Sequence, residues 1–123
     1  MSAFENRVSF VTGAGSGIGE AMALKLAGEG STVVCSDINE QGAQATAARV
    51  EELGAKAVVS ALDTANEEAV KEALTKTTRD LGRLDVLMNN AGVGGKNWET
   101  TTAINLDGVY YGLIHACPIM AGQ

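Results

Sequence analysis

The apolar residues of this chain alternate between short compact runs and segments with helical spacing. The compact runs are rich in valine and occupy residues 7–12, 31–37, 55–63 and 84–90. Runs of this length and composition are typical of strands that are buried on both faces of a parallel sheet. The segments between them have the longer period of amphipathic helices. The alternation of the two patterns predicts an α/β fold with a parallel sheet.

Each run is followed by a segment whose apolar residues recur on one helical face. The predicted stripes, in chain order, are Ile18, Met22 and Leu26; Ala43, Ala47, Val50 and Leu53; Val70, Ala73, Leu74 and Leu81; and Ile104, Val109, Leu113 and Ile114. The third helix is the best marked, because Thr64 and Glu67 suit a capping box at its start and Gly82 suits its end. The fourth helix is expected over about residues 99–116, with Pro118 ending the pattern.

The order of these elements predicts a Rossmann-type doubly wound sheet. Right-handed crossovers would place the strands in the order 3-2-1-4. The prediction covers about four strands, so the fold is expected to be truncated, without the second half of such a sheet. A chain of 123 residues, 46% of them hydrophobic, is long enough for one core, and a single domain is expected over residues 1–123.

Charge and cysteine content narrow the classes of partner. The net charge of -6 and the pI of about 4.6 argue against nucleic acid and anionic membranes, which require a basic surface. No apolar run approaches the ~18 residues of a membrane span, and residues 1–5 lack the features of a signal peptide. Cys35 and Cys117 fit neither a metal site nor a disulfide framework. We therefore expect a soluble protein in the reducing cytoplasm.

A glycine-rich loop, Thr12 to Gly19, joins the first predicted strand to the first predicted helix. Glycines at this junction let the backbone turn tightly and approach a pyrophosphate, which the free N–H groups and positive end of the helix would bind. Gly19 would let the helix pack closely on the strand. The alternative is a strand–helix turn without a ligand, because the glycine pattern alone is a weak signal.

Two acids follow the next two predicted strands. Asp37 follows Gly19, the last glycine of the loop, by close to the ~20 residues that typically separate such a loop from a carboxylate that binds the adenosine ribose hydroxyls. It would repel a 2′-phosphate, and neither Ser16 nor Ile38 offers the cation that such a phosphate needs, so the sequence favours NAD over NADP. Asp63 could meet the adenine amino group. A solvated strand-end acid is the alternative for Asp37, and a helix cap is the alternative for Asp63.

The loop Thr12-Gly13-x-x-x-Gly17-x-Gly19, together with Asn89-Asn90-Ala91-Gly92 after the fourth run, closely resembles the short-chain dehydrogenase/reductase family. The likeness covers the N-terminal half of the family's usual length. It also includes Asp37, Asp63, Gly82-Arg83-Leu84-Asp85, Trp98 and Asn105-Leu106-x-Gly108.

The resemblance implies an NAD-dependent oxidoreductase that transfers hydride between the nicotinamide ring and a small alcohol or carbonyl substrate, and a homo-oligomer. It assigns the pyrophosphate to the glycine loop, the ribose to Asp37, the adenine to Asp63 and the active-site asparagine to Asn105, which would brace its helix and help to hold a water. An amide that bonds backbone at a helix kink is the alternative for Asn105. The implied cofactor-binding residues are Gly13, Ser16, Gly17, Ile18, Gly19, Asp37, Asp63, Asn90, Ala91 and Gly92.

The serine, tyrosine and lysine that the family uses in catalysis are not found in this sequence. A Tyr-x-x-x-Lys pair would share a helix face, but Tyr110 is followed four residues later by Ile114, and Tyr111 by His115. The connection from Gly92 to Trp98 is also shorter than the family's. This would move the start of the last helix relative to the fourth strand and alter both the dimer contact and the nicotinamide end of the site.

Three functions therefore remain open. They are the cofactor-binding part of an oxidoreductase, an NAD-binding module without catalysis, and an S-adenosylmethionine-dependent methyltransferase. The wide spacing from Gly13 to Gly17 and the run from Asn89 to Gly92 speak against the methyltransferase. Turnover of NAD with secondary alcohols would distinguish the first two.

The fourth strand is expected to present an apolar edge, which self-association or another polypeptide would cover.

Overall fold

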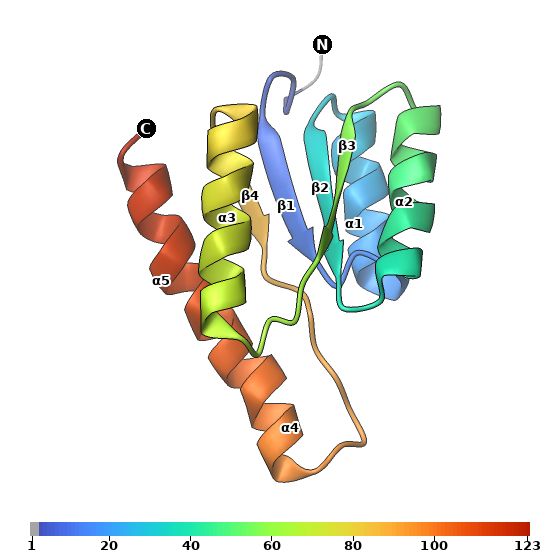
Figure 1. Cartoon of the computed structure of the whole chain (residues 1–123). Coiled ribbons are helices and arrows are strands. Elements are labelled where there is room, and N and C mark those ends of the chain that lie inside the picture. Colours follow the sequence, from blue (N-terminus) through green and yellow to red (C-terminus); the bar gives the residue numbers. More distant parts are fainter. Residues whose placement is uncertain (1–2) are drawn as a thin grey trace.

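The computed structural model describes residues 3–123. It contains one parallel sheet of four strands in the order β3-β2-β1-β4 (Figure 1). The strands are β1 (Val8–Thr12), β2 (Thr32–Asp37), β3 (Ala57–Ala61) and β4 (Val86–Met88). The predicted α/β class and strand order are confirmed. The expectation about a signal peptide depends partly on Met1 and Ser2, which lie outside the described residues.

Helices cover both faces of this sheet (Figure 1). One face packs against α1 (Gly17–Gly28) and α2 (Glu40–Glu52), and the other packs against α3 (Glu67–Leu81) and α5 (Gly108–Ala121). A short helix, α4 (Trp98–Thr102), and one π-helical segment, Ala103–Asp107, lead into α5. Helix α4 lies beyond the carboxyl ends of the strands (Figure 1). Between residues 3 and 123, no helix combines the length and apolar character needed to cross a membrane.

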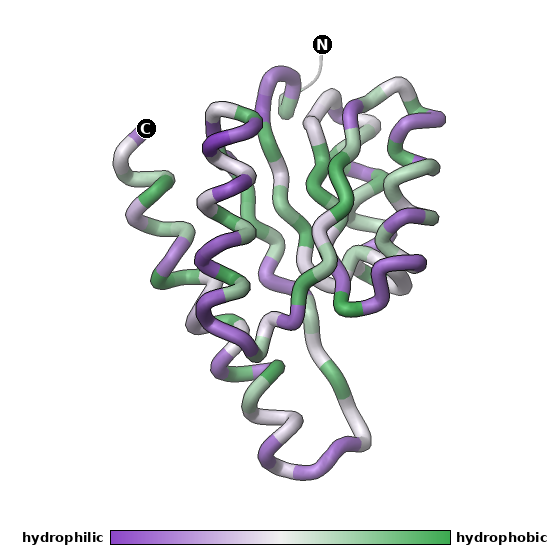
Figure 2. The backbone as a smooth tube through the Cα atoms, viewed as in Figure 1, coloured by the Kyte–Doolittle hydropathy of each residue, from purple (hydrophilic) through white to green (hydrophobic). Residues whose placement is uncertain are grey.

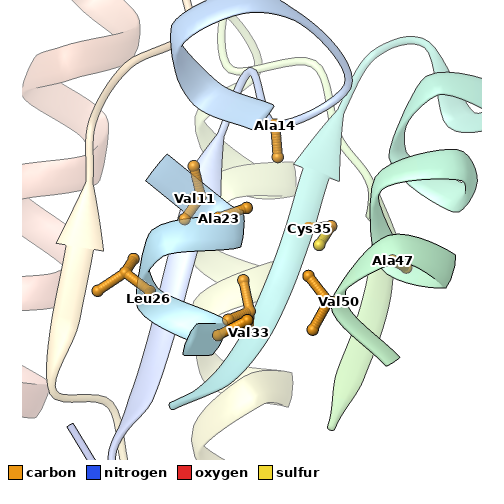
Figure 3. Packing of buried hydrophobic residues seen from close by; sticks show 9 residues of the cluster. Val11, Ala14, Ala23, Leu26, Val33, Cys35, Ala47 and Val50 are labelled. Carbon is orange, nitrogen blue, oxygen red and sulfur yellow. The ribbon is translucent and has the colours of Figure 1, made fainter. Parts of the chain in front are cut away.

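Alternate residues of the central strands supply two separate cores. Val11, Val33 and Cys35 pack against α1 and α2 (Figure 3), whereas Phe10 and Val34 pack against α3 and α5. Burial raises the pKa of the Cys35 thiol to about 11, so the side chain stays neutral. The two central strands, β1 and β2, are therefore apolar on both faces, while α3 carries hydrophilic residues along its outer side (Figure 2).

The residues before β4 fasten its start to β1. Arg83 donates two hydrogen bonds to Asp85, each 2.7 Å long, and the backbone N–H of Val8 donates to the same carboxylate at 2.8 Å. The hydrogen bonds from Arg83 hold the pKa of Asp85 below its usual range. This carboxylate therefore remains ionised and bonded to both segments at neutral pH.

The prediction that all four strands are buried on both faces is wrong for the two edge strands, β3 and β4. Val58 of β3 is 37% exposed, and the three residues of β4 are half-buried, because each of these strands pairs with one neighbour only. The third and fourth strands are also shorter than the predicted 55–63 and 84–90. Of the residues predicted as strand, 62–63 and 89–90 belong instead to the turns that follow β3 and β4.

The predicted helix stripes are partly wrong. Ile18 is 73% exposed, and Leu53 and Leu113 are exposed as well, although each was expected in the core. The buried face of α5 consists instead of Gly108, Gly112 and Ala116. These small residues let the helix lie close to the turns after β3 and β4, so large apolar residues were the wrong guide to its inner face.

The predicted cap at the start of α3 is wrong, whereas its predicted end is confirmed. The capping box of Thr64 and Glu67 does not form, because Asn66 caps α3 and accepts a 3.1 Å hydrogen bond from the N–H of Ala69. Gly82 ends α3 in the left-handed conformation, with φ of 85°, as expected.

The last predicted helix, residues 99–116, is not a single regular helix. It begins at Trp98, contains the π-helical segment, and continues through Pro118 to Ala121. A proline removes one helical hydrogen bond. Beyond it, Ile119 and Met120 pack on the core, and the side chain of Gln123 makes two 2.8 Å hydrogen bonds to the backbone of Leu84. These contacts offset the missing bond.

Candidate functional site

A cleft of about 440 Å³ lies at the carboxyl edge of the sheet. Every predicted cofactor-binding residue except Gly19 lines it. The lining residues are Gly13, Ser16, Gly17, Ile18, Asp37, Ile38, Leu62, Asp63, Thr64, Asn90, Ala91, Gly92, Val93 and Ile104. The cleft therefore brings together the turns after all four strands.

Two glycines of the loop are required by close contacts beneath the cleft. Gly13 has φ of +67°, and a Cβ there would lie 2.9 Å from Nδ2 of Asn90. A Cβ on Gly19 would overlap the carbonyl group of Gly13 and the side chain of Asn90. The expectation that Gly19 allows α1 to pack closely on β1 is confirmed.

Gly17 and Ser16 stand at the start of α1, facing the cleft. Gly17 has φ of +57° and open space beside it, so its conformation rather than crowding favours glycine. Ser16 is the N-cap residue, but its hydroxyl makes no capping hydrogen bond. The N–H groups of the first helical turn and this hydroxyl are therefore available to an anion, which the helix dipole would also attract.

Asp37 is held in a defined orientation at the end of β2. Its Oδ2 accepts a 2.8 Å hydrogen bond from the N–H of Gly15, and its Oδ1 accepts one of 2.9 Å from the N–H of Asn39. The carboxylate is thus fixed against the glycine loop rather than free in solvent. This arrangement differs from the alternative of a merely solvated acid.

Asp63 forms a local turn and does not cap α3. Its Oδ1 accepts a 2.9 Å hydrogen bond from the N–H of Ala65, whereas the cap of the helix is Asn66. The capping alternative for Asp63 is therefore wrong. The side chain is exposed and lines the cleft on the side of β3.

Thr12 joins the ends of β1 and β4, a role that the sequence analysis missed. Its Oγ1 accepts hydrogen bonds of 2.9 Å from the N–H groups of both Asn90 and Ala91, and it donates one of 3.2 Å to the carbonyl of Met88. Asn90 returns a 3.1 Å bond from Nδ2 to the carbonyl of Thr12. The only available signal was a hydroxyl at the end of a buried strand.

Asn105 does not line the cleft. Its carboxamide makes two 2.8 Å hydrogen bonds with the backbone N–H and C=O of Val93, which does line it. These two hydrogen bonds join the π-helical segment to the loop after β4. Asn105 thus bonds backbone at an irregular part of the helix, as its structural alternative proposed.

Five lining residues were not predicted as site residues, and four of them are apolar. The four apolar residues are Ile38, Leu62, Val93 and Ile104. Of these, Leu62 was expected in a buried strand and Ile104 in the apolar stripe of the last helix. The histidine that follows Tyr111 by one turn is bonded elsewhere, since Nε2 of His115 lies 2.9 Å from Oε2 of Glu67 on α3. Residues 3–123 contain no cluster of three side chains able to hold a metal ion.

The sequence of this chain matches one known protein family over almost its whole length. The model of the short chain dehydrogenase family matches residues 7–123. The chain belongs to the short-chain dehydrogenase family. Levodione reductase of Leifsonia aquatica is 36% identical to it over 132 residues, covering 98% of this chain and 49% of the reductase. The chain spans about half the length of the curated relatives it matches.

Solved short-chain dehydrogenase structures share the fold closely. An NAD+-bound xylitol dehydrogenase has a TM-score of 0.96 and 33% identity, covering 99% of this chain and 51% of its own. A metagenomic short-chain oxidoreductase in complex with NADP has a TM-score of 0.91 and 33% identity, covering 98% of this chain and 59% of its own. Structural neighbours of this chain therefore bind one or the other dinucleotide.

Proposed function

We propose that this chain is the NAD-binding domain of a short-chain dehydrogenase, which transfers hydride between the nicotinamide ring and a small alcohol or carbonyl substrate. One observation carries the proposal: a single cleft joins the start of α1 to Asp37, Asp63 and the loop after β4. The bound dinucleotide would supply the hydride acceptor or donor. The residues of this chain would bind and orient it.

The start of α1 is suited to the pyrophosphate. Ser16 offers an unused hydroxyl, and Gly17 lets the backbone turn without a side chain in the way. The N–H groups of the first turn favour a negatively charged ligand. On the other side, Asn90, Ala91 and Gly92 would lie beside the cofactor. Thr12 bonds to the first two of these residues, and Asn105 bonds to Val93, which follows them. A water-holding role for Asn105 remains part of this proposal.

The choice of NAD over NADP depends on Asp37. The negative charge that Gly15 and Asn39 hold in place would repel a 2′-phosphate, while its oxygens can still accept hydrogen bonds from ribose hydroxyls. Among the described residues that line the cleft there is no lysine or arginine. A 2′-phosphate would therefore meet one fixed anion and no cation.

Replacing Asp37 with arginine should narrow or reverse this preference. We expect the unaltered chain to bind NADH more tightly than NADPH, because only NADPH brings a phosphate against the carboxylate. Fluorescence titration of both reduced cofactors measures the two dissociation constants. Glu51→Arg makes the same change of charge at an exposed site on α2 and should leave the preference unchanged. Equal affinities of the unaltered chain for both cofactors would refute the role of Asp37.

A dinucleotide-binding module without turnover is the second candidate. It is favoured by the identity of the residue one turn after Tyr111, which is His115 and not a lysine. The ring of His115 is bonded to Glu67 on α3. Binding of NADH without oxidation of any secondary alcohol would support this candidate.

We also propose that the chain forms a homo-oligomer in the cytoplasm. Leu106, Tyr110 and Leu113 are exposed on the segment that leads into and forms α5, and β4 pairs only with β1. A second copy would remove both apolar surfaces from water. Sedimentation at micromolar concentration should give a species larger than a monomer, and a clean monomer would contradict the proposal. The free thiols of Cys35 and Cys117 suit a reducing compartment.

A further inference from the structure

The peptide group between Ala14 and Gly15, in the middle of the glycine loop, is hydrogen-bonded at both ends. Its N–H belongs to Gly15 and donates to Oδ2 of Asp37 at 2.8 Å. Its carbonyl belongs to Ala14 and accepts a 2.8 Å hydrogen bond from Oγ1 of Thr46. One planar group therefore connects the loop to the end of β2 on one side and to α2 on the other.

Thr46 reaches this carbonyl from inside the protein. The residue is 0% exposed and lies on α2, one turn after Gly42. A Cβ on Gly42 would lie 3.1 Å from the carbonyl oxygen of Gly15, so the helix and the loop are in close backbone contact. Because of this contact, a short side chain one turn later is long enough to bond the loop.

We propose that Thr46 is a positioning residue, which orients the Asp37 carboxylate through the Ala14–Gly15 peptide group and so strengthens the preference for NAD. The inference extends the proposed function. A buried carbonyl without a donor is unfavourable, so loss of the hydroxyl would turn the peptide group toward another partner. Because the group is planar, the N–H of Gly15 would turn away from Asp37 with it. The carboxylate would then keep only its bond from Asn39.

The test compares cofactor binding by variants of the 123-residue chain. Thr46→Val preserves the shape of the side chain and removes the hydroxyl. We expect its dissociation constant for NADH to rise about three- to tenfold, and its preference for NADH over NADPH to fall about threefold. Partial unfolding of the variant would weaken the binding of NADH and NADPH equally, and would leave the ratio of the two dissociation constants unchanged. Thr46→Ser retains the donor and should restore the preference.

Thr77→Val is the matched control. Thr77 is also a buried helical threonine, but its hydroxyl bonds at 2.8 Å to the carbonyl of Ala73 in its own helix. Its replacement should leave the ratio of the two dissociation constants unchanged. The proposal would be overturned if Thr77→Val changed the ratio as much as Thr46→Val, or if Thr46→Val left it unchanged.

Amide hydrogen exchange of the cofactor-free chain separates this inference from the proposed function. In Thr46→Val, the N–H of Gly15 should exchange faster relative to the N–H of Val11 in the centre of β1, as measured by NMR. An unchanged relative rate would overturn the role of Thr46. Failure of the unaltered chain to bind either dinucleotide would overturn the proposed function and the effect on cofactor choice, but the exchange rates would still show whether Thr46 holds the loop.

Discussion

Replacing Gly19 with alanine is expected to lower the free energy of unfolding by about 3 kcal/mol or more, at the upper end of the usual cost of overpacking. The added Cβ would overlap the carbonyl of Gly13 and the side chain of Asn90. The first of these is backbone and cannot rotate away. Helix α1 would have to move from β1, although alanine by itself favours a helix by up to about 1 kcal/mol. Urea unfolding measures the loss.

Gly28→Ala provides the control within the same helix. A Cβ at Gly28 would meet no atom within 4 Å, so the substitution should be neutral or stabilise the chain by up to about 1 kcal/mol. The displaced helix of the Gly19 variant should also lose affinity for NADH. Equal unfolding midpoints for the two variants would show that the contact between α1 and β1 is not as close as described.

Much of the fold could be predicted because it depends on local patterns. Valine-rich runs separated by helical stripes are sufficient for a parallel sheet, and crossover handedness then orders its strands. The exposure of Val58 follows from the edge position of the third strand in the predicted order 3-2-1-4, although the valine-rich run by itself indicated a buried strand. The small-residue face of α5 could not be predicted in the same way, because it depends on contacts with turns that lie far away along the sequence.

The candidate site shows the same division. Gly13, Gly17 and Asp37 could be predicted because a strand-to-helix turn and the next strand end must lie at one edge of a parallel sheet. Thr12 and Thr46 could not, because a threonine hydroxyl is identified as a contact only when its partner is known. Their partners are the turn after β4 and the middle of the glycine loop.

The role of Thr12 leads to the second large effect. Thr12→Val should lower the free energy of unfolding by about 1–3 kcal/mol, because the backbone N–H of Ala91 would lose its acceptor. The N–H of Asn90 would lose one of two acceptors and keep its 2.9 Å hydrogen bond to the carbonyl of Met88. Thr12 is only 4% exposed, so water does not readily replace its hydroxyl.

Valine matches threonine in shape and suits a strand, so the loss in Thr12→Val can be assigned to the hydroxyl. Thr12→Ser keeps the hydroxyl and removes one methyl group, and should cost about 1 kcal/mol. Thr12→Val should also weaken NADH binding, since Asn90 and Ala91 line the cleft. Urea unfolding and NADH titration of the two variants test both effects together. If valine and serine at this position proved equally stable, the junction of β1 and β4 would depend on packing rather than on the hydroxyl of Thr12.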